Sequence, residues 1–385
     1  DEYAAKFRNL KEKLNLFPEL HFIRTTDPHH KAAAQEFWRR CMAAGDIYKK
    51  NYEVKYCVGC ELEKTDSELQ NGRCPIHPNL DLETIKEENY FFRFSKYQVP
   101  LLDLYARRPD LVVPDYRFNE IRAFVAAGLQ DFSVSRLKSK MPWGVPVPDD
   151  DEQVLFVWFD ALINYISTLG WPEDTATFEK YWGIIPSPKA LQVAGKDNLR
   201  QQSAMWQAML ISADLPSTRQ IVIHGFITSG GQKMSKSLGN VIDPYAIVEE
   251  YGTDALRLFL ARHIHPFEDS DFTMEKFKES YNADLANGLG NLAARILTLA
   301  EANLTGNEVT PSHVEGVSSF PKEYSDALDS YDYNTAADYV WKLIGELDKE
   351  LTDTKPFSVV KEDPEKGRAM ITSMIERLYH VARLL

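Results

Sequence analysis

The chain has 385 residues, of which 44% are hydrophobic and 26% charged. This composition is typical of folded globular domains and excludes wholesale disorder, and the length suffices for two or three domains. The formal net charge of -13 argues against indiscriminate binding to polyanions. It does not exclude nucleic acid, because local basic patches decide affinity.

The sequence shows neither a membrane span nor a secretory signal. No apolar run reaches the roughly 18 residues that a spanning helix needs, and residues 1–6 lack a basic and then apolar pattern. The 4 cysteines are too few for a disulfide scaffold in a chain of this length. A cytoplasmic location is therefore expected.

The first predicted helix begins after Asp27, where an N-cap residue is followed by Pro28. Apolar residues recur at every fourth position along it, and Gly45 stands where a C-cap would end it. Its predicted buried face consists of Ala33, Phe37 and Cys41. Residues 46–130 are predicted to be loop-rich.

Short β-rich runs cover residues 154–159, 190–194 and 220–224, and a helical pattern covers 203–212. Alternation of strands and helices with continuously apolar strands predicts an α/β fold with a parallel sheet covered on both faces. After about residue 282, apolar residues repeat at helical spacing, which predicts a helical bundle. Its first expected stripe is Leu285, Leu289, Leu292, Ile296 and Leu299.

A cysteine and histidine cluster has the spacing of a metal site. Cys57 and Cys60 form one knuckle, and Cys74 and His77 form a second after thirteen intervening residues. Thiolate and imidazole ligands suit Zn²⁺, and four protein ligands leave no position for water, so the zinc would be structural. Four unrelated residues or a disulfide are the alternatives.

The segment 230–240 combines two glycines with Lys233 and Lys236. Two lysines three positions apart can converge on successive phosphates, and they would stabilise charge on a departing pyrophosphate. A solvated basic turn after a strand is the plainer interpretation of the same residues.

Several motifs together resemble the methionyl-tRNA synthetase family of class I, in the bacterial form with a single zinc knuckle. The resemblance covers essentially the whole chain. It is carried by the cysteine and histidine knuckles, Trp158-Phe159-Asp160-Ala161, Gly195-Lys196-Asp197 and Lys233-Met-Ser-Lys-Ser237. It implies a Rossmann-like catalytic domain that uses ATP with Mg²⁺ to make methionyl-adenylate and then transfers methionine to tRNA(Met). Lys233 and Lys236 would be the catalytic residues.

The resemblance also implies three groups of binding residues. The ATP contacts would be Gly195, Asp197, His224, Gly225, Ile227, Lys233, Ser235 and Lys236. The methionine pocket would be Trp158, Ala161, Leu162, Tyr165, Asn198 and Gln202. The anticodon readers would be Asn291, Arg295 and Phe357.

Each group also has a structural interpretation. Asp197 could cap a helix, and His224, Gly225 and Ile227 could be structural. Trp158 and Tyr165 could belong to the core, while Asn291 and Arg295 could be a helix-surface pair. The sequence departs from the family where Asn198 and Gln202 replace an apolar residue and a histidine, and where Phe357 replaces a tryptophan.

The family's His-Ile-Gly-His motif does not occur, and His29, His30, His263 and His265 lie in other contexts. We therefore expect a preceding strand, helix and turn before Asp1, and a continuation of the last bundle beyond Leu385. The alternatives are a non-catalytic tRNA-binding fragment and a synthetase for another apolar amino acid. The expected division is the end of the first catalytic half (1–45), zinc insertion (46–130), second catalytic half (131–227), lysine loop and stem-contact region (228–281) and anticodon-binding helices (282–385).

Overall fold

The computed structural model describes residues 2–64, 66–234, 239–305 and 320–385. They form two compact units, one of His21–His224 and one of Asp1–Leu20 with Gly225–Leu385. The expected five-part division stays a prediction. The structure adds that the first twenty residues belong to the same unit as the C-terminal helices.

A parallel sheet lies at the centre of the first unit. Its strands are β11 (Leu191–Gly195), β12 (Gln220–His224) and β4 (Val112–Val113), in the order β11-β12-β4. Three successive residues of β12, Ile221 to Ile223, are buried, as expected for a strand covered on both faces. The predicted runs 190–194 and 220–224 are thereby confirmed as parallel strands. The expected cover on both faces holds for β12 but not for β11, where Leu191 and Val193 are 45% and 59% exposed.

The predicted strand over 154–159 is wrong in its second half and in its sheet. β8 (Asp150–Leu155) pairs antiparallel with β6 (Ser135–Leu137) and β7 (Pro146–Val147). Helix α5 (Val157–Ala161) then begins two residues later. A short apolar run is compatible with a strand or a buried helical turn, so hydrophobicity alone does not separate them.

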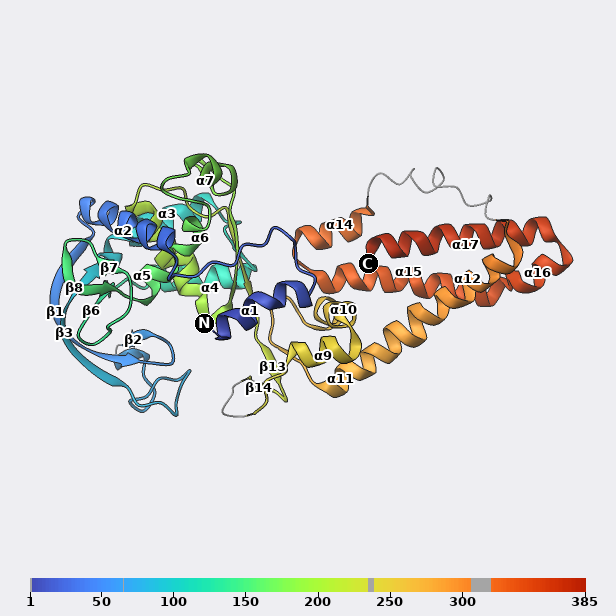
Figure 1. Cartoon of the computed structure of the whole chain (residues 1–385), viewed down its shortest axis with the longest axis horizontal. Coiled ribbons are helices and arrows are strands. Elements are labelled where there is room, and N and C mark those ends of the chain that lie inside the picture. Colours follow the sequence, from blue (N-terminus) through green and yellow to red (C-terminus); the bar gives the residue numbers. More distant parts are fainter. Residues whose placement is uncertain (1, 65, 235–238, 306–319) are drawn as a thin grey trace. The chain divides into compact units, whose positions relative to one another are not determined.

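The prediction that residues 46–130 are loop-rich is also wrong. β1 (Ile47–Cys57) and β3 (Glu83–Phe92) form a long antiparallel ribbon, visible at the edge of the first unit in Figure 1. β2 (Leu62–Lys64) pairs with the far end of β1. Helices α3 (Gln98–Arg107) and α4 (Asp115–Ala126) follow, and β4, which lies between them, joins the parallel sheet.

The helices of the first unit contribute side chains to one hydrophobic core. α2 (Pro28–Ala43) has Asp27 as its N-cap, and its predicted apolar face is fully buried. Phe37 of α2 stacks on Trp206 of α8 (Trp206–Ser212) at 5.6 Å between ring centroids. The other helical segments are α6 (Asn164–Ser167), α7 (Thr175–Tyr181), the 3-10 turns η2 (Phe94–Tyr97) and η3 (Lys196–Asn198), and the π turn η4 (Gln201–Met205).

The second unit is mainly helical, which confirms the predicted bundle. α15 (Tyr333–Thr354) and α17 (Pro364–Leu384) run along each other and are joined by α16 (Pro356–Glu362), as Figure 1 shows. Leu292 and Ile296 of the predicted stripe are buried in the bundle core, where Leu289 and Leu299 are partly buried. Leu285 packs instead in a separate cluster around Phe277.

None of the helices in the described part of the chain is long and apolar enough to cross a membrane. The elements are α1 (Glu2–Lys13), β13 (Ile227–Ser229), β14 (Gln232–Lys233), α9 (Pro244–Tyr251), α10 (Thr253–His263), β15 (Ser270–Asp271), α11 (Met274–Ser280), the π segment η6 (Tyr281–Gly290), α12 (Asn291–Asn303), α14 (Lys322–Asp329), α15 (Tyr333–Thr354), α16 (Pro356–Glu362) and α17 (Pro364–Leu384).

A fully buried carboxylate ties the first unit together. Asp46, directly before β1, accepts hydrogen bonds from Lys96 Nζ at 2.6 Å, Ser212 Oγ at 2.8 Å and the Tyr97 hydroxyl. Its backbone carbonyl accepts from Arg93 N at 2.8 Å. One side chain therefore connects the ribbon, the η2 turn and helix α8.

Replacing Asp46 should destabilise the protein strongly. Asp46→Ala leaves buried donors on Tyr97 and Ser212 without their acceptor, so we expect the free energy of unfolding to fall by about 3 kcal/mol. Chemical denaturation measures this change. The control is Asp103→Ala on the exposed side of α3, for which we expect a change below about 0.5 kcal/mol; equal losses in both variants would contradict the role of Asp46.

Candidate active site and metal centre

The four predicted metal ligands come together at the far end of the β1–β3 ribbon. The ligand atoms of Cys57, Cys60, Cys74 and His77 all lie within 4.8 Å of one another. Cys60 Sγ is 3.4 Å from Cys74 Sγ and 3.3 Å from His77 Nδ1. A tetrahedron with Zn–S bonds of about 2.3 Å has sulfur atoms about 3.7 Å apart, so the donor set and its spacing fit zinc.

Gly59 makes room for the histidine of this cluster. A Cβ at this position would lie 2.6 Å from His77 Cγ, which is closer than carbon atoms pack. The second of the two residues between Cys57 and Cys60 must therefore be glycine if the imidazole is to face the three sulfur atoms.

The carboxyl ends of the parallel strands bring three predicted site residues together. Gly195 pairs with His224 across β11 and β12. A Cβ on Gly195 would lie 2.8 Å from Asp197 Oδ1 and 3.6 Å from His224 Cε1. The carboxyl edge of an open parallel sheet is where such folds bind ligands. At this edge the carboxylate of Asp197 and the imidazole of His224 lie next to the backbone of Gly195, which has no side chain.

The residues predicted for the methionine pocket lie on α5, on α6 and on the segment after β11. Leu162 is 2% exposed and packs in the core, whereas Trp158, Ala161 and Asn198 are half-buried. Among the described residues, the buried indole nitrogen of Trp158 has no hydrogen-bond partner. Val157, just before it, has a φ of 27°, a strained conformation for a β-branched residue that is typical of functional sites.

One hydrogen bond joins two of these predicted pocket residues. Gln202 Nε2 donates to the Tyr165 hydroxyl at 2.8 Å, and Gln202 is 4% exposed. Burial raises the pKa of Tyr165, so its hydroxyl stays protonated at neutral pH. Because Gln202 supplies the donor in this pair, the phenolic proton of Tyr165 is available to another acceptor.

A cavity of about 690 Å³ lies between the ribbon and the body of the first unit, and neither Tyr165 nor Gln202 lines it. Phe156, Trp158, Arg200 and Met205 line its inner wall. Glu68, from the segment between the predicted metal ligands, also lines the cavity and accepts a hydrogen bond from Arg200 Nη1 at 2.9 Å. This ion pair links the segment with the four candidate metal ligands directly to the segment that carries Gln202.

His30 and Asp160 form a pair that the sequence motifs did not reveal. His30 is fully buried, and its ring nitrogens lie 2.9 Å from Ser167 Oγ and 2.9 Å from Asp160 Oδ1. The pair anchors α2 to α5 and α6, next to Trp158. Its members are 130 positions apart, so no local pattern could have connected them.

In the second unit, Lys233 lies at the end of a tight hairpin. Thr228 pairs with Lys233 across β13 and β14, and the two-residue turn is Gly230-Gly231 with φ values of 61° and 72°. Two successive positive φ angles favour glycine at both positions. Lys233 Nζ lies 4.7 Å from the ring centroid of Phe226, while Ser235 and Lys236 fall outside the described residues.

The other predicted residues of the second unit are distributed along it. A Cβ on Gly225 would lie 2.2 Å from the Glu268 carbonyl oxygen, so the backbone approach requires glycine. Ile227 is 40% exposed on β13. In the helices, Asn291 is exposed, Arg295 Nη1 donates to Asp348 Oδ1 at 2.6 Å, and the Phe357 ring is 43% exposed.

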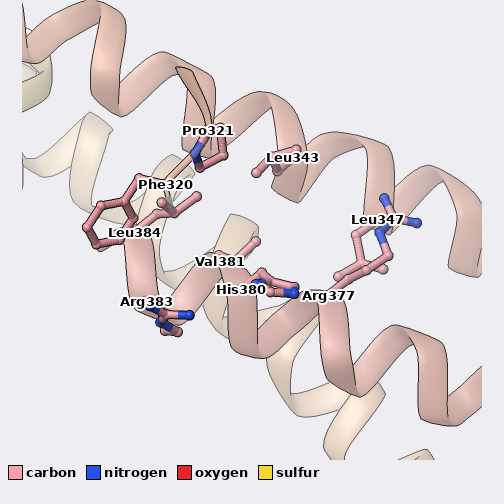
Figure 2. A pocket seen from close by; sticks show the side chains of 9 residues that line it. All are labelled: Phe320, Pro321, Leu343, Leu347, Arg377, His380, Val381, Arg383 and Leu384. Atoms are coloured by element: carbon pink, nitrogen blue, oxygen red, sulfur yellow. The ribbon is translucent and has the colours of Figure 1, made fainter. Parts of the chain in front are cut away.

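The helical bundle also contains an apolar pocket of about 290 Å³ near the end of α17. Figure 2 shows Leu343, Leu347 and Val381 around it, with Arg377, His380 and Arg383 at its rim. Asn291, Arg295 and Phe357 do not line this pocket. The pocket therefore does not involve the predicted anticodon residues.

Comparisons with known proteins agree with this arrangement. The family described as tRNA synthetases class I (M) matches residues 1–80 and 62–297. The methionine–tRNA ligase of Thermotoga maritima is 40% identical over 394 residues, which cover 99% of this chain and 61% of that protein. The enzyme of Nostoc sp. is 39% identical, with coverage of 100% and 74%. The chain thus spans about three fifths of the Thermotoga relative.

A solved structure is similar over the same range. Mycobacterium tuberculosis methionyl-tRNA synthetase in complex with methionyl-adenylate superposes with a TM-score of 0.86 and 34% identity, covering 98% of this chain and 76% of that one. The family match extends over more than half of the chain, and the Nostoc relative is matched over most of its length. The chain therefore belongs to the methionyl family of class I tRNA synthetases.

Proposed function

We propose that the protein containing this chain activates methionine with ATP and transfers it to tRNA(Met). The observation that carries the proposal is the hydrogen-bonded pair of Tyr165 and Gln202. Tyr165 and Trp158 both pack against the same core, and Gln202 follows Gly195 closely in sequence. The aromatic side chains suit a thioether, which gains from sulfur–aromatic contact. The free phenolic proton of Tyr165 can be donated to the thioether sulfur, a weak acceptor that a hydrocarbon side chain lacks.

For ATP, we propose that Asp197 and His224 contact the nucleotide beside the bare backbone of Gly195. Lys233 and Lys236 would stabilise the negative charge that develops on pyrophosphate as it leaves. Mg²⁺ bound with ATP would neutralise part of the phosphate charge. The hairpin turn at Gly230-Gly231 supports this role, because it holds Lys233 at an exposed strand end.

For tRNA, we propose that Asn291, Arg295 and Phe357 read the anticodon. The exposed ring of Phe357 can stack on a base, since every base offers a π-face to an aromatic ring. Arg295 is held by Asp348, so its contact with RNA would share the guanidinium between the carboxylate and a base. A cytoplasmic site of action remains a prediction from the cysteine content.

We further propose that Cys57, Cys60, Cys74 and His77 hold one structural Zn²⁺. When bound, the metal would supply folding energy to a polar segment that has no core of its own. The ion pair of Glu68 with Arg200 would then fix the inner end of that segment against the candidate pocket.

The proposed reaction is tested by methionine-dependent exchange of labelled pyrophosphate into ATP, measured on the natural protein that contains this chain. We expect methionine to support exchange and leucine and homocysteine to support it at least about tenfold less efficiently, since a pocket discriminates a methylene or an altered polar group by about 1–3 kcal/mol. Equal efficiencies for the three amino acids would contradict methionine selectivity, and no exchange at all would contradict the activity.

The lysine loop is tested by Lys236→Ala and Lys233→Ala. Removing a charge that acts mainly in the transition state should lower the exchange rate about 10²-fold and leave the Kd for methionine nearly unchanged. Lys138→Ala is a control on an exposed position and should keep the wild-type rate. A loss of methionine affinity in parallel with the rate would assign these lysines to amino-acid binding instead.

Zinc is tested by metal analysis of protein purified without chelators. The four ligands predict about one zinc per chain, and Cys60→Ala should lose most of it and expose the segment 61–73 to proteolysis. Cys41→Ala removes a cysteine that is buried in the core of α2, so it should retain the metal. Finding no zinc in the wild type, or equal loss in both variants, would contradict the metal site.

A further inference from the structure

The methionine-pocket residue Gln202 belongs to an irregular helical turn. Residues Gln201–Met205 form a π turn in which every residue is buried, and Trp206 N donates to the Gln201 carbonyl five positions back. A π turn inserts one extra residue into the helix and has poorer hydrogen-bond geometry than an α turn. It therefore persists where the surrounding structure holds it, often at functional sites.

Two buried side chains hold this turn by its backbone carbonyls. The Tyr105 hydroxyl of α3 donates to the Ser203 carbonyl at 2.7 Å. Gln207 Nε2 donates to the Gln202 carbonyl at 3.0 Å. Tyr105 is 1% exposed and Gln207 is fully buried, so losing either carbonyl would leave a donor without a partner at the full cost of its desolvation.

Both donors are themselves fixed to the rest of the first unit. The Tyr105 ring packs edge-on against the ring of Phe118 of α4, with 5.7 Å between the ring centroids. Gln207 exchanges two hydrogen bonds with Thr218, through Nε2 to Oγ1 at 2.9 Å and from Thr218 N to Oε1 at 3.0 Å. Thr218 Oγ1 in turn donates to Gln192 Oε1 of β11 at 2.6 Å. The π turn is thus connected to the sheet on one side and to α3 on the other.

The direction of Gln202 depends on this widened turn. One residue corresponds to a rotation of about 100° around a helix axis. Relaxation of the turn to regular α-helix would therefore rotate Gln202 relative to the residues that follow it. Its Nε2 would then no longer lie 2.8 Å from the Tyr165 hydroxyl.

We infer that Tyr105 and Gln207 are positioning residues for the amino-acid pocket: they hold the π turn in the shape that brings Gln202 to Tyr165. The inference rests on the proposed function, since the pocket is the one assigned to methionine. Neither residue lies in a recognised motif, and both act through the backbone of Gln202 and Ser203. The substrate feature that they serve is the thioether that receives the Tyr165 proton.

The test is Tyr105→Phe, which keeps the packed ring and removes only the hydroxyl. We expect KM for methionine in the pyrophosphate-exchange assay to rise about five- to tenfold, while kcat stays within about twofold because the lysine loop and nucleotide contacts are untouched. The matched control is Tyr97→Phe. That hydroxyl is also buried but bonds to Asp46, so its loss should lower stability without raising KM.

A double-mutant cycle separates positioning from general damage. In a Gln202→Ala background Tyr105→Phe should leave KM unchanged, because the side chain that it positions is already gone. An unchanged KM for Tyr105→Phe in the wild-type background would overturn the inference, as would an equal rise in both backgrounds or in Tyr97→Phe. An active wild type with any of these results leaves the proposed function intact, whereas a wild type without methionine-dependent exchange contradicts both.

Discussion

The parallel register between β11 and β12 is the constraint on which the candidate site depends. It sets Gly195 opposite His224, so the segments that leave the two strands begin at the same edge of the sheet. From β11 the chain passes directly into the turn with Asp197 and then into the π turn with Gln202. Because β12 is buried on both faces, a shift of register would move apolar side chains as well as the site.

Much of this architecture could be predicted from the sequence, because it depends on local signals. Continuous apolar runs marked β11 and β12, a Pro after an N-cap marked α2, and the spacing of two knuckles marked the metal ligands. These patterns work because period and spacing reflect burial and ligand geometry within a few residues. The prediction of a strand over 154–159 was wrong for the same reason, because the apolar residues of this run belong partly to β8 and partly to the helical turn α5.

The ribbon and the long-range polar contacts could not be predicted. β1 and β3 contain many charged residues, and most of those whose side chains are described are exposed, so no continuous apolar run marks them as strands. The pairs His30 with Asp160 and Glu68 with Arg200 join residues 130 and 132 positions apart. A buried polar side chain leaves no periodic signal, and its partner is decided only when the core is assembled. The contacts of Tyr105 and Gln207 with the π turn could not be predicted for this reason, although we infer that these contacts position Gln202.

The contrast between Cys41 and the other cysteines has a chemical consequence. Burial raises the pKa of the Cys41 thiol to about 12, so at neutral pH it carries almost no thiolate, the form that reacts with alkylating reagents. Thiolates bound to a metal would be protected by coordination, and they would become reactive when the metal leaves. The number of thiols that alkylate in the native protein should therefore rise from none to three as metal is removed. Cys41 does not react in either state, so the number of alkylated thiols would report how much of the site is occupied by metal.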